Sequence, residues 1–265
     1  MRIRLAFRRL GAGSAAWLVL AALYFALPLI GVAAFSVQGA HALTFNYYNQ
    51  ILSDPNFQSS ILLSAQIAVV AVVLSLILMT PMVFWINLRL PRIRPIMDFI
   101  GVLPFVVPPV TLGVGVIGVF QGFPWMLSGP HILVFIYVVL TLPFTYRSLD
   151  AGFQAIPLKT LTEAGQNLGS SWATILWRIV LPNVRVAIIS AAFLSMTLVM
   201  GEYTIAAFLS FNTFGTYIFQ VGAEEANGAA ALSVLSFLIT WAAMFGILFL
   251  GRGSRGQQGQ IGGAR

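Results

Sequence analysis

The chain contains no cysteine among its 265 residues, and only 8% of the residues are charged. Without cysteine, disulfide bonds, thiol catalysis and cysteine-ligated metal sites are excluded. The two histidines, His41 and His131, lie far apart, and we expect interfacial or loop positions for them rather than a metal site. The sequence also lacks a Walker A pattern, a Gly-x-Ser-x-Gly motif, a His-Glu-x-x-His motif and clustered carboxylates in a polar setting. We therefore expect neither an enzyme nor a chain with a metal or cofactor of its own.

Apolar residues dominate the composition instead. They make up 59% of the chain and give a mean hydropathy of +0.92, whereas soluble domains carry about 25% charged residues. This composition indicates an integral membrane protein. The net charge of +7 does not indicate nucleic acid as a partner. The basic residues are spread over four segments beside apolar runs, where they set topology and contact lipid headgroups.

Six apolar runs are long enough to cross a hydrocarbon core of about 30 Å, which needs about 20 residues of helix. They lie near residues 14–36, 60–86, 97–120, 130–148, 183–209 and 229–250. Each crossing must satisfy its own backbone hydrogen bonds in lipid, so spans of this length are helices. We expect an all-α integral membrane protein, a six-helix transmembrane bundle forming a single domain over residues 1–250. The Gly- and Gln-rich segment 251–265 is too poor in apolar residues to pack, and we expect it to be disordered.

The basic residues also predict an orientation. All fourteen Lys and Arg lie before the first run, between the second and third, around the loop between the fourth and fifth, or after the sixth. Alternate crossing puts these four segments on one side, which by the positive-inside rule is the cytoplasm. Both termini and the 149–182 loop are then cytoplasmic. The outer loops carry Asp54, Glu224 and Glu225 and no Lys or Arg.

The longest polar interruption between apolar runs separates the fourth from the fifth. Within it, Pro157 suits the first turn of a short helix, because it has no N–H and its φ is preset. Gly169 suits the left-handed position just past the end of that helix, so a helix of about three turns is expected between them. Ser170 or Ser171 can cap a second short helix, which Pro182 ends. One face of this second helix carries Trp172, Ile175, Leu176 and Ile179.

Seven residues of this loop resemble the EAA loop of the permease subunits of ABC importers. They are Glu163-Ala164-Gly165, then Gly169 after three residues, then Ile179-x-Leu181-Pro182 after nine more. The one departure from the family pattern is Gly165, where a second alanine is expected, and it keeps the residue small. The resemblance implies that the helix bearing Glu163 is a coupling helix, which binds in a groove of a cytoplasmic ATPase and transmits ATP-driven closure to the membrane helices. An ordinary amphipathic helix lying on the membrane surface is the alternative.

The same resemblance, which extends over about residues 14–250, implies the fold of a type I ABC importer permease in a bacterial-type plasma (inner) membrane. It also implies partners. They are two cytoplasmic ATP-binding subunits that hold the ATP and Mg, a second permease subunit that is a homologue or a copy of this chain, and an extracytoplasmic substrate-binding protein. The outer loop around Phe45 to Phe57 is a plausible docking surface for that protein.

The third run is rich in helix-breaking residues. Pro104, Pro108 and Pro109 interrupt the hydrogen-bond ladder, so we expect a kink or a short break there. One interpretation places this irregular backbone beside a translocation path, and the other treats it as a permissible kink with small residues for close helix packing. The resemblance favours the path, because the corresponding helix of the family helps to line the central cavity.

Glu202 is the one acidic residue expected deep in a span, next to Tyr203. A charge at the bilayer centre costs about 2.5 to 3.5 kcal/mol on insertion scales, so such a residue usually faces a cavity or a partner. A carboxylate beside an aromatic ring can hold an ammonium group of a cationic substrate. The alternatives are a structural carboxylate, bonded to the backbone or hydroxyl groups of a partner subunit, and a protonated one.

Three functions fit some or all of these residues. The resemblance implies the membrane subunit of an ATP-driven importer working by alternating access. An ion-coupled carrier or channel would use Glu202 as its ion site, and a purely structural scaffold would need neither the broken third run nor the deep carboxylate. The residues around Gly201-Glu202-Tyr203 most resemble permeases for spermidine and putrescine. Permeases for ferric iron, thiamine, sulfate, molybdate, phosphonate and sugars share the same plan.

Overall fold

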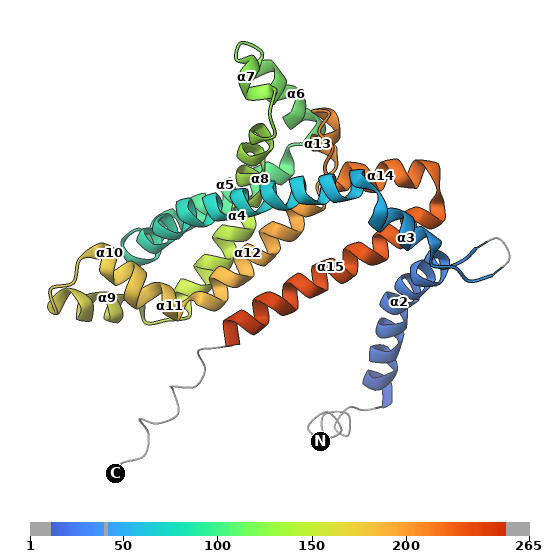
Figure 1. Cartoon of the computed structure of the whole chain (residues 1–265). Helices are drawn as coiled ribbons and strands as arrows, with labels where there is room; N and C mark the ends of the chain where they lie inside the picture. Colours follow the sequence, from blue (N-terminus) through green and yellow to red (C-terminus); the bar gives the residue numbers. More distant parts are fainter. Residues whose placement is uncertain (1–11, 40–41, 253–265) are drawn as a thin grey trace. The chain divides into compact units, whose positions relative to one another are not determined.

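The computed structural model describes residues 12–39 and 42–252, and throughout this part of the chain the regular elements are helices (Figure 1). They are α2 (Ala12–Ser36), α3 (Asn46–Ser53), α4 (Pro55–Arg89), η1 (Pro91–Ile93), α5 (Arg94–Val106), α6 (Pro109–Phe120), α7 (Pro124–Leu127), α8 (His131–Gln154), α9 (Leu158–Asn167), α10 (Trp172–Thr174), η2 (Ile175–Val180), α11 (Leu181–Asn183), α12 (Arg185–Met200), α13 (Thr204–Phe208), α14 (Phe214–Glu224) and α15 (Ala226–Arg252). An isolated antiparallel bridge joins Gln38 to Leu43. The all-α prediction is confirmed for the described residues.

The described residues fall into two compact units. The first comprises residues 12–54 and 218–239, and the second comprises residues 55–217 and 240–252. The single-domain organisation of residues 1–250 stays a prediction. Of the tail expected to be disordered, Gly251 and Arg252 form the last residues of α15, and the rest lies outside the described residues.

Four helical segments among the described residues are long and apolar enough to cross a membrane. They are Ala16–Ser36, Pro55–Arg89, His131–Gln154 and Arg185–Phe208. A fifth span is possible if Pro91–Val106 and Pro109–Phe120, which meet at an angle of 92°, are counted together. The sixth predicted span falls within α15, of which Ala226–Ala242 is a shorter apolar stretch. The number of six spans and the side of the membrane on which the termini lie stay predictions.

Three long helices, α4, α8 and α12, pack against one another at the centre of the second unit. Hydroxyl groups join them in pairs: Ser75 lies 2.6 Å from Thr141, and Thr145 lies 3.2 Å from Ser195. In lipid, helices gain no hydrophobic energy from meeting, so packing and such hydrogen bonds between helices stabilise the bundle. Large apolar side chains on the outside of α4, such as Leu62, are the expected surface for lipid or for another subunit.

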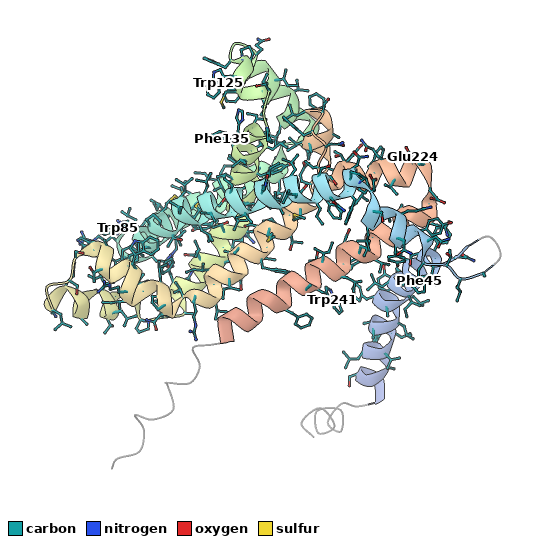
Figure 2. The ribbon with its side chains drawn as sticks, viewed as in Figure 1. Phe45, Trp85, Trp125, Phe135, Glu224 and Trp241 are labelled. Carbon is teal, nitrogen blue, oxygen red and sulfur yellow. The ribbon has the colours of Figure 1, made fainter. Side chains whose placement is uncertain are left out.

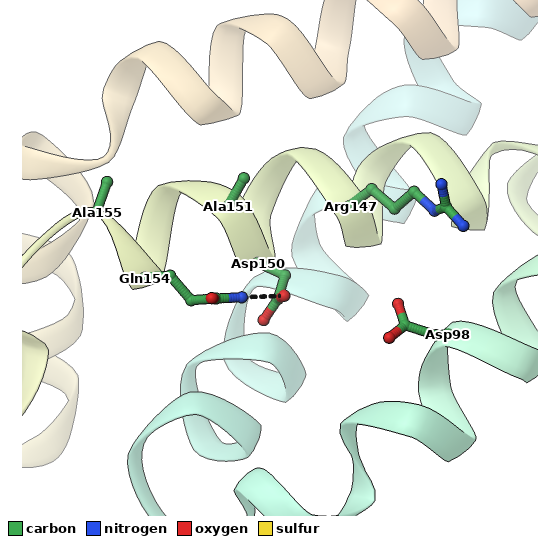
Figure 3. A pocket seen from close by; sticks show the side chains of 6 residues that line it. All are labelled: Asp98, Arg147, Asp150, Ala151, Gln154 and Ala155. Carbon is green, nitrogen blue, oxygen red and sulfur yellow. Dashed lines mark hydrogen bonds between the residues drawn. The ribbon is translucent and has the colours of Figure 1, made fainter.

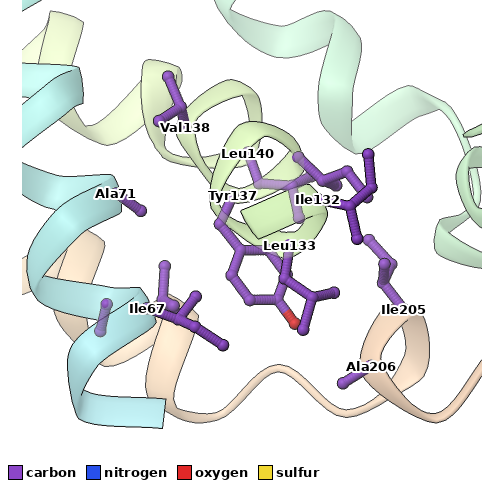
Figure 4. Close-up of a cluster of buried hydrophobic side chains, with 12 residues drawn as sticks. Ile67, Ala71, Ile132, Leu133, Tyr137, Val138, Leu140, Ile205 and Ala206 are labelled. Atoms are coloured by element: carbon purple, nitrogen blue, oxygen red, sulfur yellow. The ribbon is translucent and has the colours of Figure 1, made fainter. Parts of the chain in front are cut away.

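The interior of the second unit consists of two clusters of buried apolar side chains. One surrounds Tyr137 on α8 and includes Ile67 of α4 and Ile205 of α13 (Figure 4). The other lies where the same long helices meet the 149–182 loop, and it includes Phe84 of α4, Phe153 of α8 and Ile175 of η2. The loop is therefore packed against the ends of the membrane helices by a shared core.

In the first unit, side chains from distant segments satisfy the end of α2. The Asn227 side-chain amide at the start of α15 donates hydrogen bonds to the carbonyl oxygens of Phe35 (3.0 Å) and Gln38 (2.8 Å). The Ser36 hydroxyl lies 2.6 Å from the Tyr48 hydroxyl of α3. The last carbonyls of a helix have no partner within the helix, so the bond from Asn227 to Phe35 stabilises the C-terminus of α2. The other two contacts hold the residues that surround this helix end.

Candidate functional site

The helix predicted to contain Glu163 is α9, whose ten residues make about three turns. Pro157 occupies the N-cap position, one residue before the first turn in which we expected it. One face of α9 is buried through Leu158, Thr162 and Gly165. Glu163 and Ala164 lie on the exposed face, with 58% of the Glu163 side chain exposed and its Oε1 3.9 Å from Lys159 Nζ. The conspicuous part of the motif is thus available to a partner.

The end of α9 has the geometry expected from its glycine. Gly169 adopts φ +74°, in the left-handed region. Its N–H donates to the Gln166 carbonyl (2.8 Å), and the Ser170 N–H donates to the Gly165 carbonyl (3.0 Å). This pair of bonds is the Schellman motif, which satisfies carbonyls that the helix leaves free. The prediction made for Gly169 is confirmed.

The second helix of the loop begins as predicted but does not continue as an α-helix. The Ser171 hydroxyl accepts a hydrogen bond from the Thr174 N–H (3.2 Å) and caps α10. From Ile175 to Val180 the chain makes wider π-helical turns, contrary to the α-helical spacing used for Ile179. Pro182 has no N–H for the carbonyl four residues earlier, so a regular ladder cannot run through it. One residue further on, the Asn183 side chain donates to the Ile179 carbonyl (2.7 Å).

The small residue at 165 is explained by its contact with the second half of the loop. A Cβ atom on Gly165 would lie 2.9 Å from Ile175 Cγ1 and 3.0 Å from Ile179 Cδ1. Both distances are too short for ordinary contact, so these two isoleucines occupy the space of the missing side chain. Leu181 and Pro182 belong to α11, which continues from η2 to Asn183 and precedes α12. The prediction that Pro182 ends the second helix is therefore wrong, because the helical turns run through it to Asn183. The matched residues of the loop thus form one hairpin, in which α9 packs on η2.

Glu202 lies in a break that the sequence analysis did not foresee within the 183–209 run. The run divides into α12 and α13, and the Glu202 carboxylate accepts three hydrogen bonds at the gap. The Tyr137 hydroxyl donates to Oε2 (2.6 Å), the Ile205 N–H to Oε1 (2.9 Å) and the Ala206 N–H to Oε2 (3.3 Å). A carboxylate at a helix N-terminus satisfies N–H groups that have no partner within the helix. All three donors belong to this chain. The alternative of a structural carboxylate had placed its donors in a partner subunit.

Tyr203, next to Glu202, is the N-cap residue of α13. The start of α14 approaches this gap so closely that a Cβ on Gly215 would lie 2.6 Å from the Glu202 carbonyl oxygen. The gap is therefore a packed feature of the backbone. Whether Glu202 or Tyr203 contacts a transported molecule stays a prediction.

The break predicted in the third run lies at Val107 and Pro108, between α5 and α6. Both residues are extended, with ψ values of 122° and 137°, as is favoured for residues that precede proline. Pro109 then begins α6, and the two helices meet at 92°. On α6, a Cβ at Gly113 would lie 2.7 Å from Phe208 Cδ1 of α13. The segments that follow the two breaks therefore pack on each other. That Pro108 and Pro109 line a translocation path stays a prediction.

A polar network that sequence reasoning missed joins α4, α5 and α8. Asp150 Oδ1 accepts from the Asn87 amide (2.7 Å), and its Oδ2 accepts from the Gln154 amide (2.5 Å). Arg94 Nε lies 3.6 Å from Asp150, and the Arg94 guanidinium also donates to Asn87. An open pocket of about 580 Å³ beside this network is lined by Asp98, Arg147, Asp150, Ala151, Gln154 and Ala155 (Figure 3). In the sequence, the charged residues of this region lie near the ends of the predicted spans 97–120 and 130–148, and this shared position was the signal that could have indicated the network.

Comparison with known proteins gives relatives with several different cargoes. The molybdenum transport system permease protein ModB of Azotobacter vinelandii is 27% identical over 169 residues, covering 58% of this chain and 73% of that protein. A spermidine/putrescine transport system permease protein PotB homolog of Mycoplasma pneumoniae is 33% identical over 135 residues, covering 47% and 46%. The ferric transport system permease protein FbpB of Actinobacillus pleuropneumoniae is 32% identical over 114 residues, covering 43% and 16%. The match thus spans less than half the length of the last two proteins.

A solved structure shares the fold over almost the whole chain. A chain of a bacterial ABC transporter involved in the import of the acidic polysaccharide alginate superposes with a TM-score of 0.66, covering 95% of this chain and 99% of that one. A second structure of a bacterial alginate ABC transporter, in complex with an alginate pentasaccharide-bound periplasmic protein, gives a TM-score of 0.63 and covers 89% and 91%. Both are 16% identical in sequence, so they show the fold alone.

The family model for the binding-protein-dependent transport system inner membrane component matches residues 82–255. This match covers well over half of the chain, including the 149–182 loop and both helix breaks. The long apolar helices fit the membrane setting that the family description states. The chain is therefore an integral membrane protein that belongs to the family of binding-protein-dependent transport system inner membrane components.

Proposed function

We propose that this chain is the membrane-spanning permease subunit of an ATP-driven type I ABC importer, and that α9 is its coupling helix. The observation that carries the proposal is the shape of the 149–182 loop. Glu163 and Ala164 lie on an exposed face of α9, while Gly165 fixes the opposite face against Ile175. A helix held firmly on one side and free on the other is suited to transmit force from a partner.

The exposed surface of the hairpin supports a protein partner on chemical grounds. Leu168, just past α9, is 86% exposed, although it is a large apolar side chain. Burial of a leucine side chain against a partner contributes about 1.5–3 kcal/mol. Beside it, Ala164 allows close approach of the partner backbone, and the Glu163 carboxylate offers a charged hydrogen-bond acceptor.

The partners in this proposal are two cytoplasmic ATPase subunits, a second permease subunit and an extracytoplasmic substrate-binding protein. The ATPase subunits hold ATP and Mg and perform the hydrolysis. ATP draws them together, the coupling helices follow, and the membrane helices change from inward-open to outward-open. Family membership supports the binding protein and does not favour the ion-coupled carrier.

For the cargo we propose a polyamine, and Glu202 supports this assignment chemically. A carboxylate has about four lone-pair sites, and three hydrogen bonds reach Glu202 from its own chain. One lone-pair site of the Glu202 carboxylate is left for an ammonium group, with Tyr203 beside it.

The named cargoes of the relatives include molybdenum, spermidine/putrescine and ferric iron. Because the amide of Glu202→Gln carries no charge to pair with an ammonium group, this variant should slow uptake of radiolabelled spermidine while the ATPase still co-purifies. Unchanged uptake kinetics would refute the proposed contact between Glu202 and the polyamine.

The direct test of coupling is the charge reversal Glu163→Lys. We expect ATPase co-purification or ATP-driven uptake to fall about tenfold, which corresponds to about 1.4 kcal/mol of lost contact, while membrane insertion persists. Glu224→Lys is the matched control, because Glu224 is also an exposed carboxylate but lies at the end of α14. Intact uptake and wild-type ATPase co-purification in Glu163→Lys would remove α9 from the mechanism.

A further inference from the structure

The hairpin formed by α9, α10 and η2, called the coupling hairpin below, contacts α4 through a cluster of two tilted indole rings and a guanidinium group. Trp85 lies on α4 (Figure 2). Trp172, the first residue of α10, has its ring centroid 4.7 Å from that of Trp85, and the two rings are tilted by 49°. Arg89, one helical turn after Trp85, places its Cζ atom 5.2 Å from the Trp172 ring and 5.4 Å from the Trp85 ring. We call these three side chains the Trp172 clamp.

The clamp lies at the point where the hairpin joins the membrane helices. Trp172 directly follows the Ser171 cap, and the Schellman turn at Gly169 connects that cap to α9. Phe84, the neighbour of Trp85, makes edge-to-face contacts with both Trp172 (6.5 Å) and Phe153 of α8 (6.2 Å). A displacement of the hairpin therefore reaches α4 through Trp172 and reaches α8 through Phe84.

The chemistry of the clamp suits a contact that must hold its orientation. A guanidinium group is attracted to the face of an indole ring within about 6 Å of the centroid. Because Arg89 meets two such rings, one on each side of the junction, a tilt of the hairpin would separate the cation from one of them. Aliphatic contacts alone are less directional and permit sliding. The Trp172 clamp therefore links the orientation of the coupling hairpin to that of the last turn of α4.

A second tryptophan in the same loop provides a natural contrast. Trp177 on η2 is 66% exposed. Within the part of the chain that the structure describes, it contacts neither another aromatic ring nor a cation in the way that Trp172 does. It resembles Trp172 in size, in apolar character and in its place within the hairpin. The two residues differ in the partners that they touch.

We propose that Trp172, held by Trp85 and Arg89, is the positioning residue that makes α4 follow the coupling helix, an inference that rests on the function proposed above. Loss of the clamp leaves the ATPase able to bind α9, but α9 is then coupled to α4 only through the aliphatic core around Ile175. Binding and hydrolysis of ATP persist, whereas the movement of the membrane helices is reduced.

This chain has no native cysteine, so spin labels can be placed at chosen positions in the complete complex, reconstituted in lipid with an ATPase and a binding protein whose own reactive thiols are removed. Cysteines introduced at Thr160, exposed on α9, and at Leu78, exposed on α4, carry spin labels for distance measurement with and without ATP and Mg. In Trp172→Ala, the population of displaced α9–α4 distances should rise about fivefold, as expected for losing one cation–π contact. Trp172→Phe and Arg89→Lys, which keep a ring or a cation, should restore part of the wild-type distribution, and Trp177→Ala should match wild type.

The amount of co-purified ATPase distinguishes a failure of the proposed importer function from a failure of the positioning role of Trp172. The inference is supported if Trp172→Ala retains the ATPase and its hydrolysis but shows the broadened distances. It is overturned if Trp172→Ala retains the ATPase with a wild-type distribution, or if Trp177→Ala broadens the distances equally. If the unaltered chain never assembles with an ATPase, the proposed function itself fails, and the inference fails with it.

Discussion

Tyr137 on α8 donates its hydroxyl hydrogen to Glu202 Oε2, 2.6 Å away in the gap between α12 and α13. This bond joins residues that are 65 positions apart in the sequence. It fixes the carboxylate over the first N–H groups of α13, so the broken span is held to the central helix of the bundle. The close-up of the buried cluster shows the Tyr137 ring directed toward Ile205 and Ala206 of α13 (Figure 4).

Removal of the Tyr137 hydroxyl should lower the stability of the second unit. Tyr137→Phe keeps the ring but leaves the Glu202 carboxylate without its side-chain donor, and a hydrogen bond to a charged group contributes about 1.5–3 kcal/mol. The midpoint of thermal unfolding in detergent micelles should therefore fall. Tyr24→Phe is the control, because the Tyr24 side chain is 74% exposed. Equal midpoints for the two variants would contradict the role assigned to the bond.

The left-handed conformation of Gly169 should be costly for any side chain. Gly169→Ala places a Cβ on a residue with φ +74°, which costs about 1–2 kcal/mol, and it frays the end of α9. Amide hydrogen exchange at Leu168 and Ser170 should become faster. Gly118→Ala lies in α6 with nothing near its added Cβ, so it should leave exchange in the loop unchanged. Unaltered protection in Gly169→Ala would count against the Schellman turn.

At Ser210 the removal of a side chain from a left-handed residue should raise the stability. It has φ +60° at the end of α13, outside the range that a serine prefers, and its N–H donates to the Ala207 carbonyl (3.1 Å). Ser210→Gly removes the steric cost of the left-handed conformation, and we expect a gain of about 0.5–1 kcal/mol. A rise in the unfolding midpoint checks this, and a fall would show that the serine side chain contributes more than the strain it causes.

The contact between Gly165 and Ile175 predicts an energetic coupling between the two positions. Gly165→Ala adds a methyl group 2.9 Å from Ile175 Cγ1 and 3.3 Å from Ile175 Cδ1, whereas Ile175→Ala removes both of these atoms. The double variant should be more stable than the sum of the single effects by at least about 0.5 kcal/mol. Additive unfolding free energies in this cycle would mean that the hairpin does not close on Gly165.

Local features were predictable where one residue determines the backbone. Gly169 and Ser171 revealed the turn and the cap of the loop, and Pro108 with Pro109 revealed the break in the third run, because glycine, serine and proline act on their immediate neighbours. Features that depend on distant packing were not predictable. Neither the contact of Gly113 with Phe208 nor the bond between Tyr137 and Glu202 leaves any periodic pattern in the sequence.

Of the candidate site, the sequence predicted the local turns and caps but not the contacts between distant segments. The residues of the loop and their spacing indicated α9, yet the π-helical turns from Ile175 to Val180 contradicted the regular face assumed there. The network of Asn87, Arg94 and Asp150 combines three elements, and its members are ordinary polar residues when read singly. Trp172 was predicted as one member of an apolar face, whereas its cation–π contact with Arg89 depends on α4, which is distant in the sequence.

The central claim is that α9 faces the cytoplasm and binds an ATPase, and site-specific labelling tests it most directly. Glu163→Cys provides the single thiol in a chain without native cysteine. A membrane-impermeant maleimide should label this thiol in inside-out vesicles stripped of ATPase, and readdition of the ATPase should protect it. Right-side-out vesicles should remain unlabelled. Labelling from the outer face, or equal labelling with and without the ATPase, would contradict the account.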